Sequence, residues 1–262
     1  MDPMTRSEAA QAGAIKRERE GSSTPRFEAI SQPRAHDFVV EQIRRQIALG
    51  VIPPGSALPP ERELVKLFGV GRVTVQLAIG QLEAERVIET RRGRAGGSFV
   101  VAPSTDDRAL DYRLVEVRRG AGRVIETLDY RKIIEPAAAA MAAQRCRKQE
   151  LREIESMLER AEAAVDDAEF MRWDTAFHLA VASASRNHFL LEGVEKVRLD
   201  LSPVLSLLPD TEVWHGISNR EHREIFDALQ DKDPERAAES MRQHAAYADK
   251  SVRSLLKSLA RT

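Results

Sequence analysis

Four side chains in the second half of the chain have the types and the spacing of a metal site. Asp174 and His178 lie four residues apart, so on a helix they share one face. His222 and His244 follow in two later segments with helical periodicity. One carboxylate and three imidazoles suit a first-row divalent ion such as zinc, nickel or manganese. Taken singly, each histidine is better explained as a surface residue or as a hydrogen-bonded core residue.

Helices must position these residues, because helical periodicity runs from Val124 to the end of the chain without a competing strand pattern. The predicted helices cover residues 124–146, 148–165, 168–185, 188–207, 212–230 and 234–259. In the last connection, Asp233 can cap a helix that begins at Pro234. The short connections predict an antiparallel bundle of six or seven helices, in which the helices that carry the histidines converge.

A different pattern occupies residues 35–101, where three short helices precede a pair of strands. The first helix is predicted over residues 35–49, and the second begins at Pro60-Glu61 and ends at Gly69-Val70-Gly71. The third runs from Arg72 to about Glu85 and has an apolar stripe made of Val75, Ala78, Ile79 and Leu82. Its opposite face carries Arg72, Val73, Gln76 and Gly80. This arrangement is typical of a helix-turn-helix whose last helix enters the major groove of DNA.

The predicted strands, residues 86–90 and 98–101, are joined by a segment rich in arginine and glycine. Arginines in such a hairpin can contact phosphates or enter the minor groove, and glycines let the backbone approach DNA closely. The strand pair is therefore predicted to be the wing of a winged helix. The residues predicted to contact DNA are Arg62, Arg72, Thr74, Gln76, Arg92, Gly93 and Arg94. Arginine matches guanine O6 and N7, and glutamine matches adenine N6 and N7.

The composition limits the classes of protein that remain. The chain has 262 residues, of which 31% are charged, and its net charge is −1. Affinity for nucleic acid must therefore come from local charge such as that of the wing. The single cysteine excludes an intrachain disulfide and suits a reducing compartment. Neither a membrane-spanning apolar run nor a signal-peptide pattern is found, so we expect a cytoplasmic protein.

These patterns predict a mostly α-helical chain with two folded domains. Residues 1–33 are expected to be a disordered tail, with a basic arm that helps to hold DNA as the alternative. Residues 34–104 are expected to form the winged helix-turn-helix domain, and residues 105–122 a connector with a hinge at residues 120–122. Residues 123–262 are expected to form the helical domain.

The segment LPPERELVKLFGVGRVTVQLAIGQLEAERVIETRRGRAGGSFVV, residues 58–101, resembles the DNA-binding domain of the GntR family of bacterial transcription regulators. Some residues depart from the pattern of that family. Pro60 replaces a capping serine, and Arg86 replaces the glycine that normally ends the recognition helix. On that helix, Val73 replaces a threonine, Gln76 an arginine and Leu77 an acid. Because Val73 and Gln76 lie on the outer face, we expect an operator that differs from the common one of the family.

The helical half resembles the FCD (FadR C-terminal) effector domain that accompanies such winged helices. The resemblance rests on Arg131/Glu135, Asp174/His178, Ser183–Asn187, Glu221/His222 and His244. It implies that Asp174, His178, His222 and His244 are the ligands of a divalent metal. A divalent ion with one carboxylate and three neutral imidazoles keeps a charge of about +1, which a bound anion would offset. Arg131 is predicted to add a fork for a carboxylate effector; the alternative is a surface ion pair with Glu135. Asn187 is expected to cap the next helix.

The predicted function is that of a ligand-responsive transcription regulator, a repressor rather than an activator. We expect it to bind double-stranded DNA at a near-palindromic operator as a homodimer that pairs through the helical domain. The expected effector is a small organic acid or sugar acid bound at the metal. One alternative is a metal-dependent hydrolase with a nucleic-acid-binding head, although no general base stands beside the cluster unless Glu135 or Glu221 serves. Another is a constitutive architectural DNA-binding protein with a structural metal.

Overall fold

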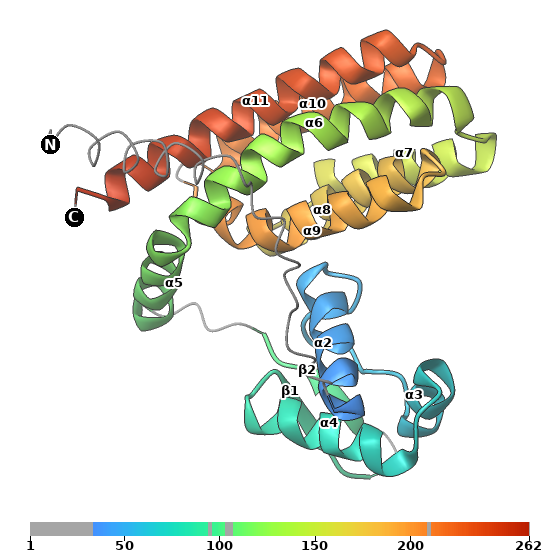
Figure 1. Cartoon of the computed structure of the whole chain (residues 1–262), viewed down its shortest axis with the longest axis vertical. Helices are drawn as coiled ribbons and strands as arrows, with labels where there is room; N and C mark the ends of the chain where they lie inside the picture. The colour runs from blue at the N-terminus through green and yellow to red at the C-terminus, as the bar shows by residue number, and fades with distance from the viewer. Residues whose placement is uncertain (1–33, 94–95, 103–106, 209–210, 262) are drawn as a thin grey trace, which may run out of the picture. The chain divides into compact units, whose positions relative to one another are not determined.

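The computed structural model describes residues 34–93, 96–102, 107–208 and 211–261. This part of the chain contains helices α2 to α11 and one two-stranded antiparallel sheet (Figure 1). The predicted mostly α-helical fold is confirmed. The predicted tail, residues 1–33, lies outside the described residues, and so does Arg94 in the wing. Among the described helices, none is both long and apolar enough to cross a membrane.

The N-terminal domain consists of α2 (Ala35–Ala48), α3 (Glu61–Phe68), α4 (Arg72–Ala84), β1 (Ile88–Arg91) and β2 (Gly97–Val100). Gly69 ends α3 in the left-handed conformation, at φ 63°, which glycine adopts without a steric penalty. The predicted stripe of α4 (Val75, Ala78, Ile79 and Leu82) is buried and packs in one core with α2 and both strands. No side chain caps α3 at Pro60, as expected from the missing serine.

Arg86 determines where the first strand starts. Its φ is 58°, so this arginine takes the left-handed conformation that a glycine usually provides after a helix. A residue in that conformation cannot belong to a strand, so β1 begins at Ile88 and the prediction of a strand from residue 86 is wrong by two residues. The register of the hairpin pairs Ile88 with Val100 and Arg91 with Gly97.

The C-terminal domain is a helical bundle. Its helices are α6 (Ala121–Arg145), α7 (Lys148–Glu162), α8 (Asp167–Ala184), α9 (His188–Leu205), α10 (Thr211–Gln230) and α11 (Pro234–Leu259), preceded by α5 (Asp107–Arg119). The long helix α6 contacts α8, α9, α10 and α11 (Figure 1). Within the described residues the bundle therefore has six helices, the lower of the two predicted numbers. Of the predicted hinge at residues 120–122, only Gly120 lies between two helices, since α6 already begins at Ala121.

Side-chain caps fix the starts of three bundle helices. Asp166 accepts a hydrogen bond from the Glu169 N–H at the start of α8. Asn187 accepts from the N–H groups of residues 189 and 190 at the start of α9, at 3.1 and 3.3 Å, so its predicted capping role is confirmed. Asp233 caps α11, whose first residue is Pro234 as predicted. These caps determine where α8, α9 and α11 begin, and α8 and α11 carry three of the candidate ligands.

Candidate metal centre and nucleic-acid interface

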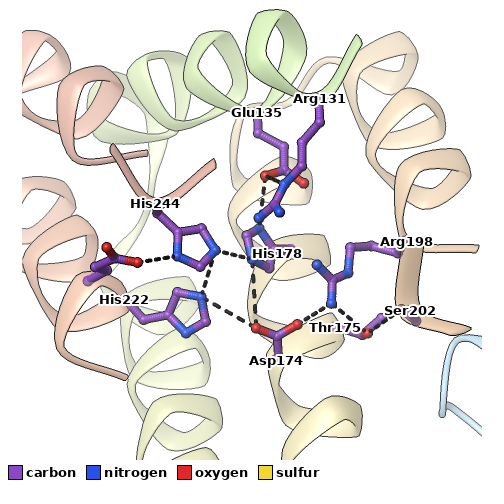
Figure 2. Close-up of polar contacts among 10 residues, drawn as sticks. Arg131, Glu135, Asp174, Thr175, His178, Arg198, Ser202, His222 and His244 are labelled. Carbon is purple, nitrogen blue, oxygen red and sulfur yellow. Dashed lines mark hydrogen bonds and ion pairs between the residues drawn. The ribbon is translucent and has the colours of Figure 1, made fainter. Parts of the chain in front are cut away.

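Helices α8, α10 and α11 bring the four predicted metal ligands together (Figure 2). One ligand atom from each of Asp174, His178, His222 and His244 lies within 4.8 Å of the others, and all four residues are buried. His244 Nε2 is 3.2 Å from His178 Nε2 and 3.3 Å from His222 Nε2. Asp174 Oδ1 is 3.5 Å from His222 Nε2 and 4.0 Å from His178 Nε2.

These distances can be compared with what an ion requires. Donors about 2.0–2.1 Å from a tetrahedral zinc ion are separated from one another by roughly 3.3 Å. Three of the distances in the cluster, 3.2, 3.3 and 3.5 Å, are close to this value, and the distance from Asp174 Oδ1 to His178 Nε2 is longer, at 4.0 Å. The four donors could therefore hold an ion of that size with little movement, and their chemistry matches the imidazole and carboxylate sets of known sites.

The ionisation states also fit metal binding. Burial lowers the pKa of His178 and His222 well below the usual value, and it lowers the pKa of His244 to about 3. Burial alone would raise the pKa of Asp174, but its charged neighbours, Arg198 first among them, together outweigh burial, and the pKa falls below its usual value. At neutral pH the centre therefore holds three neutral imidazoles and one carboxylate, the forms that bind a cation.

A second set of side chains contacts the outer atoms of three ligands. Glu221 Oε2 lies 2.9 Å from His244 Nδ1, and Glu135 Oε2 lies 3.4 Å from His178 Nδ1. The guanidinium of Arg198 donates to Asp174 Oδ2 and leaves Oδ1 facing the histidines. These contacts resemble the carboxylate–histidine and guanidinium–carboxylate pairs that orient ligands in metal proteins.

Arg131 and Glu135 form the expected pair, but not on the surface. Arg131 Nε donates to Glu135 Oε2 at 2.7 Å, and both side chains are only 1% exposed. The surface alternative is therefore wrong. Both terminal nitrogens of Arg131, Nη1 and Nη2, are buried without a hydrogen-bond partner among the described residues. A buried guanidinium with two free donor groups is suited to an anionic ligand.

Arg198 is a residue of the centre that was not predicted from the sequence. It is fully buried on α9, and its Nε and Nη1 have no partner in the described part of the chain. A signal was present in the sequence, because Arg198 lies on the buried stripe of α9, between Val194 and Leu201. An arginine in an apolar stripe indicates a buried charge that needs a partner.

The geometry also bears on the hydrolase alternative. Glu135 and Glu221 both contact an Nδ1 atom, on the side of the imidazole ring that faces away from the Nε2 donors. Neither carboxylate therefore lies where water bound to an ion in the cluster could be deprotonated.

The outer face of α4 is open, as the sequence predicts. Arg62, Arg72 and Gln76 are exposed and Thr74 is partly exposed. Gln76 Nε2 donates to Glu61 Oε2 at 3.1 Å, and Arg72 Nε lies 3.5 Å from the same oxygen. Glu61, at the start of α3, therefore contacts both Arg72 and Gln76, two of the residues predicted to bind DNA.

In the wing, the side chain of Arg91 makes contacts within the hairpin itself. It pairs with Glu89, and its guanidinium lies 4.4 Å from the centre of the Phe99 ring. Arg92 and Gly93 are exposed. A Cβ atom at Gly96 would lie 2.4 Å from the Arg91 carbonyl oxygen, so only glycine fits this turn.

Comparison with known proteins agrees with both halves of the structure. Residues 35–100 match the family of bacterial regulatory proteins called the gntR family, and residues 126–247 match the FCD domain. The Exu regulon transcriptional regulator of Escherichia coli K12 is 31% identical over 222 residues, which are 82% of this chain and 83% of that protein. The HTH-type transcriptional repressor NanR of Klebsiella aerogenes is 26% identical over 87% of this chain and 89% of its own. The Uxu operon regulator of Haemophilus influenzae is 25% identical over 80% and 79%. The chain therefore belongs to the GntR family of bacterial regulatory proteins, with a C-terminal FCD domain, and is a ligand-responsive transcription regulator rather than an enzyme.

Proposed function

We propose that this regulator binds a near-palindromic operator as a homodimer and that a small organic acid, bound at a divalent metal in the FCD domain, controls its affinity for DNA. One observation carries the proposal: four metal-binding donors converge in a buried site beside Arg131 and Arg198, whose free N–H groups have no partner among the described residues. Buried donors without acceptors destabilise a folded protein, and a ligand that accepts from them removes that cost.

In this proposal Asp174, His178, His222 and His244 hold the ion, which would be zinc, nickel or manganese. When bound, the ion would supply a positive centre that a carboxylate or hydroxyl oxygen can ligate. Arg131 would accept the carboxylate through its two free terminal nitrogens.

The charges around the centre favour an anionic effector. Arg131 and Arg198 are opposed by Glu135 and Asp174, so these four buried side chains nearly neutralise one another. A divalent ion then leaves the centre with a net positive charge, which is unfavourable in a buried site unless an anion is present. A small carboxylic acid or sugar acid provides that anion and can chelate the ion.

The effector is tested by calorimetric titration of the metal-loaded protein with hydroxy acids, dicarboxylic acids and sugar acids. We expect at least one acid to bind only when the ion is present, and its neutral amide to fail. Uniform failure of the acids would refute an acidic effector. If an acid binds but leaves the affinity for DNA unchanged, the alternative of an architectural protein with a structural metal is favoured.

At the DNA, the proposal assigns base and phosphate contacts to α4 and the wing. The proposed contacts come from the exposed side chains of Arg62, Arg72, Gln76 and Arg92, together with Thr74 and Gly93. Arg94, which lies outside the described residues, keeps its predicted contact. We expect Arg72→Ala to abolish specific operator binding while the fold stays intact, because the side chain is 77% exposed. An exposed arginine of the bundle, Arg152, provides the matched control, and an unchanged footprint of Arg72→Ala would refute the assignment.

Control by the effector requires that it binds the DNA-competent and DNA-incompetent arrangements with different affinities. A roughly 100-fold difference shifts the equilibrium by about 2.7 kcal/mol. We propose that the connector, residues 105–122, lets the two DNA-binding domains of the dimer reorient relative to the helical domains. Residues 107–119 of this connector form α5.

A further inference from the structure

The outer face of α4 carries two large apolar side chains that nothing in the described structure covers. Val73 is 68% exposed and Leu77 is 54% exposed, and they lie one helical turn apart. Gln76, between them on the same face, is also exposed. Scattered exposed apolar residues are common, but this pair occupies the first two turns of the predicted recognition helix, where side chains reach base edges.

Gly80 continues this face by one further turn. A Cβ atom at Gly80 would meet nothing within 4 Å, so packing within the described residues does not require a glycine. A glycine inside a helix is destabilising relative to alanine. The absence of a side chain is explained if a partner approaches the backbone of α4 closely at this position.

The chemistry of the face matches A·T base pairs. The C5-methyl group of thymine is the apolar group that base edges offer in the major groove, and aliphatic side chains can pack against it. A glutamine amide pairs with adenine N6 and N7. Gln76 gives one of its two amide hydrogens to Glu61, so its second hydrogen and its carbonyl oxygen stay available for adenine.

We propose that Val73 and Leu77 are specificity-determining residues that contact thymine methyl groups, and that together with Gln76 they make α4 select half-sites with A·T pairs beneath this face. The inference rests on the proposed binding of operator DNA. The adjacent exposed cations Arg62 and Arg72 favour duplex DNA as the occupant of the face over an apolar protein surface.

The test begins with selection of duplexes from a random library by the full-length protein. Thymines in the enriched half-site are then replaced one at a time by deoxyuracil, which removes only the methyl group. We expect about a threefold to fivefold loss of affinity at one or two positions, the effect of uncovering one methyl group. In Val73→Ala or Leu77→Ala, deoxyuracil at the matching position should no longer lower the affinity. Val165→Ala, at an 88% exposed site in the bundle domain, is the control and should lose affinity for deoxyuracil duplexes as the parent protein does.

Gly80→Ala separates a DNA contact from a structural role. Alanine should raise the thermal stability of the helix and lower operator affinity, two effects of opposite sign. Unchanged affinity for deoxyuracil duplexes at every position would overturn the inference while leaving operator binding intact. An absence of any enriched sequence would overturn the proposed function, and this inference with it.

Discussion

The contact between Glu221 and His244 allows a sharp test of the metal centre. Glu221 Oε2 lies 2.9 Å from His244 Nδ1, and an ionised carboxylate can only accept a hydrogen bond. His244 must then carry its hydrogen on Nδ1 and keep the Nε2 lone pair for the ion. We expect Glu221→Ala to weaken metal binding about 10-fold to 100-fold, or roughly 1.4–2.7 kcal/mol, as loss of such a partner does in other sites.

Glu221 is a better probe than Glu135 for two reasons. Its side chain is 21% exposed, so its removal admits water to His244 without leaving a buried charge unpaired. Glu135 is 1% exposed and holds Arg131 at 2.7 Å, so its loss would strand a buried guanidinium and endanger the fold. The distance from Glu135 to His178 Nδ1 is also longer, 3.4 Å, which predicts a weaker influence on metal binding.

The assay is competition for zinc with a chromophoric chelator at mildly alkaline pH, chosen because burial raises the pKa of Glu221. Glu221→Gln keeps an acceptor oxygen without the charge and should lose less than Glu221→Ala. Glu162→Gln, which breaks an exposed 2.7 Å ion pair with Arg223, is the control and should bind zinc like the parent protein. Nitrogen chemical shifts of the metal-free imidazoles report the tautomer directly. Metal affinity within twofold of the parent, or a His244 hydrogen on Nε2, would refute the reasoning.

Three further outcomes are expected. Arg86→Gly should stabilise the N-terminal domain by about 0.5–1 kcal/mol in thermal unfolding, because Arg86 has a φ of 58° and glycine removes that strain. The control, Arg62→Gly inside α3, should destabilise the domain. A loss of stability in both variants would contradict the prediction. Burial raises the pKa of the Cys146 thiol to about 11, so alkylation at pH 8 should be slower than for a free thiol by about two orders of magnitude and should accelerate as the pH rises toward 11; rapid labelling of the folded protein at pH 8 would exclude this. An ion at about 100 times its dissociation constant should add about 2.7 kcal/mol to the free energy of unfolding, which calorimetry would register as a rise of several degrees reversed by a chelator.

The sequence predicted those features that depend on local spacing. The stripe from Val75 to Leu82 follows helical periodicity, and the turn at Gly69 and the cap at Asp233 depend on residues a few positions away. The shared face of Asp174 and His178 is local in the same way. The prediction that failed in the N-terminal domain, the start of β1, depended on one backbone angle at Arg86 that an arginine seldom adopts.

The convergence of His222 and His244 on the first two ligands could be predicted only in part, since it depends on how α10 and α11 pack against α8. Resemblance to a known domain provided that information, and periodicity alone did not. The burial of Arg131 was undecidable from spacing, because an arginine and a glutamate four residues apart can pair equally well on a surface or in a core. The choice is made by the packing of α6 in the bundle, a property of the whole domain.

Arg198, which was not predicted from the sequence, helps to keep Asp174 in the ionised form that binds a cation. A carboxylate and three imidazoles in an apolar core would by themselves favour a protonated carboxylate, since burial raises the pKa of Asp174. The guanidinium of Arg198, together with the other charged neighbours of Asp174, reverses that effect, while burial and then the positive charges of Arg198 and Arg131 keep His178 neutral. Arg131 and Arg198, whose charges favour the metal-binding forms of the ligands, also have N–H groups without acceptors among the described residues. An anion that accepts from these groups would stabilise the centre only when the ion is present, because the ion supplies the net positive charge, and metal and effector are therefore expected to bind cooperatively.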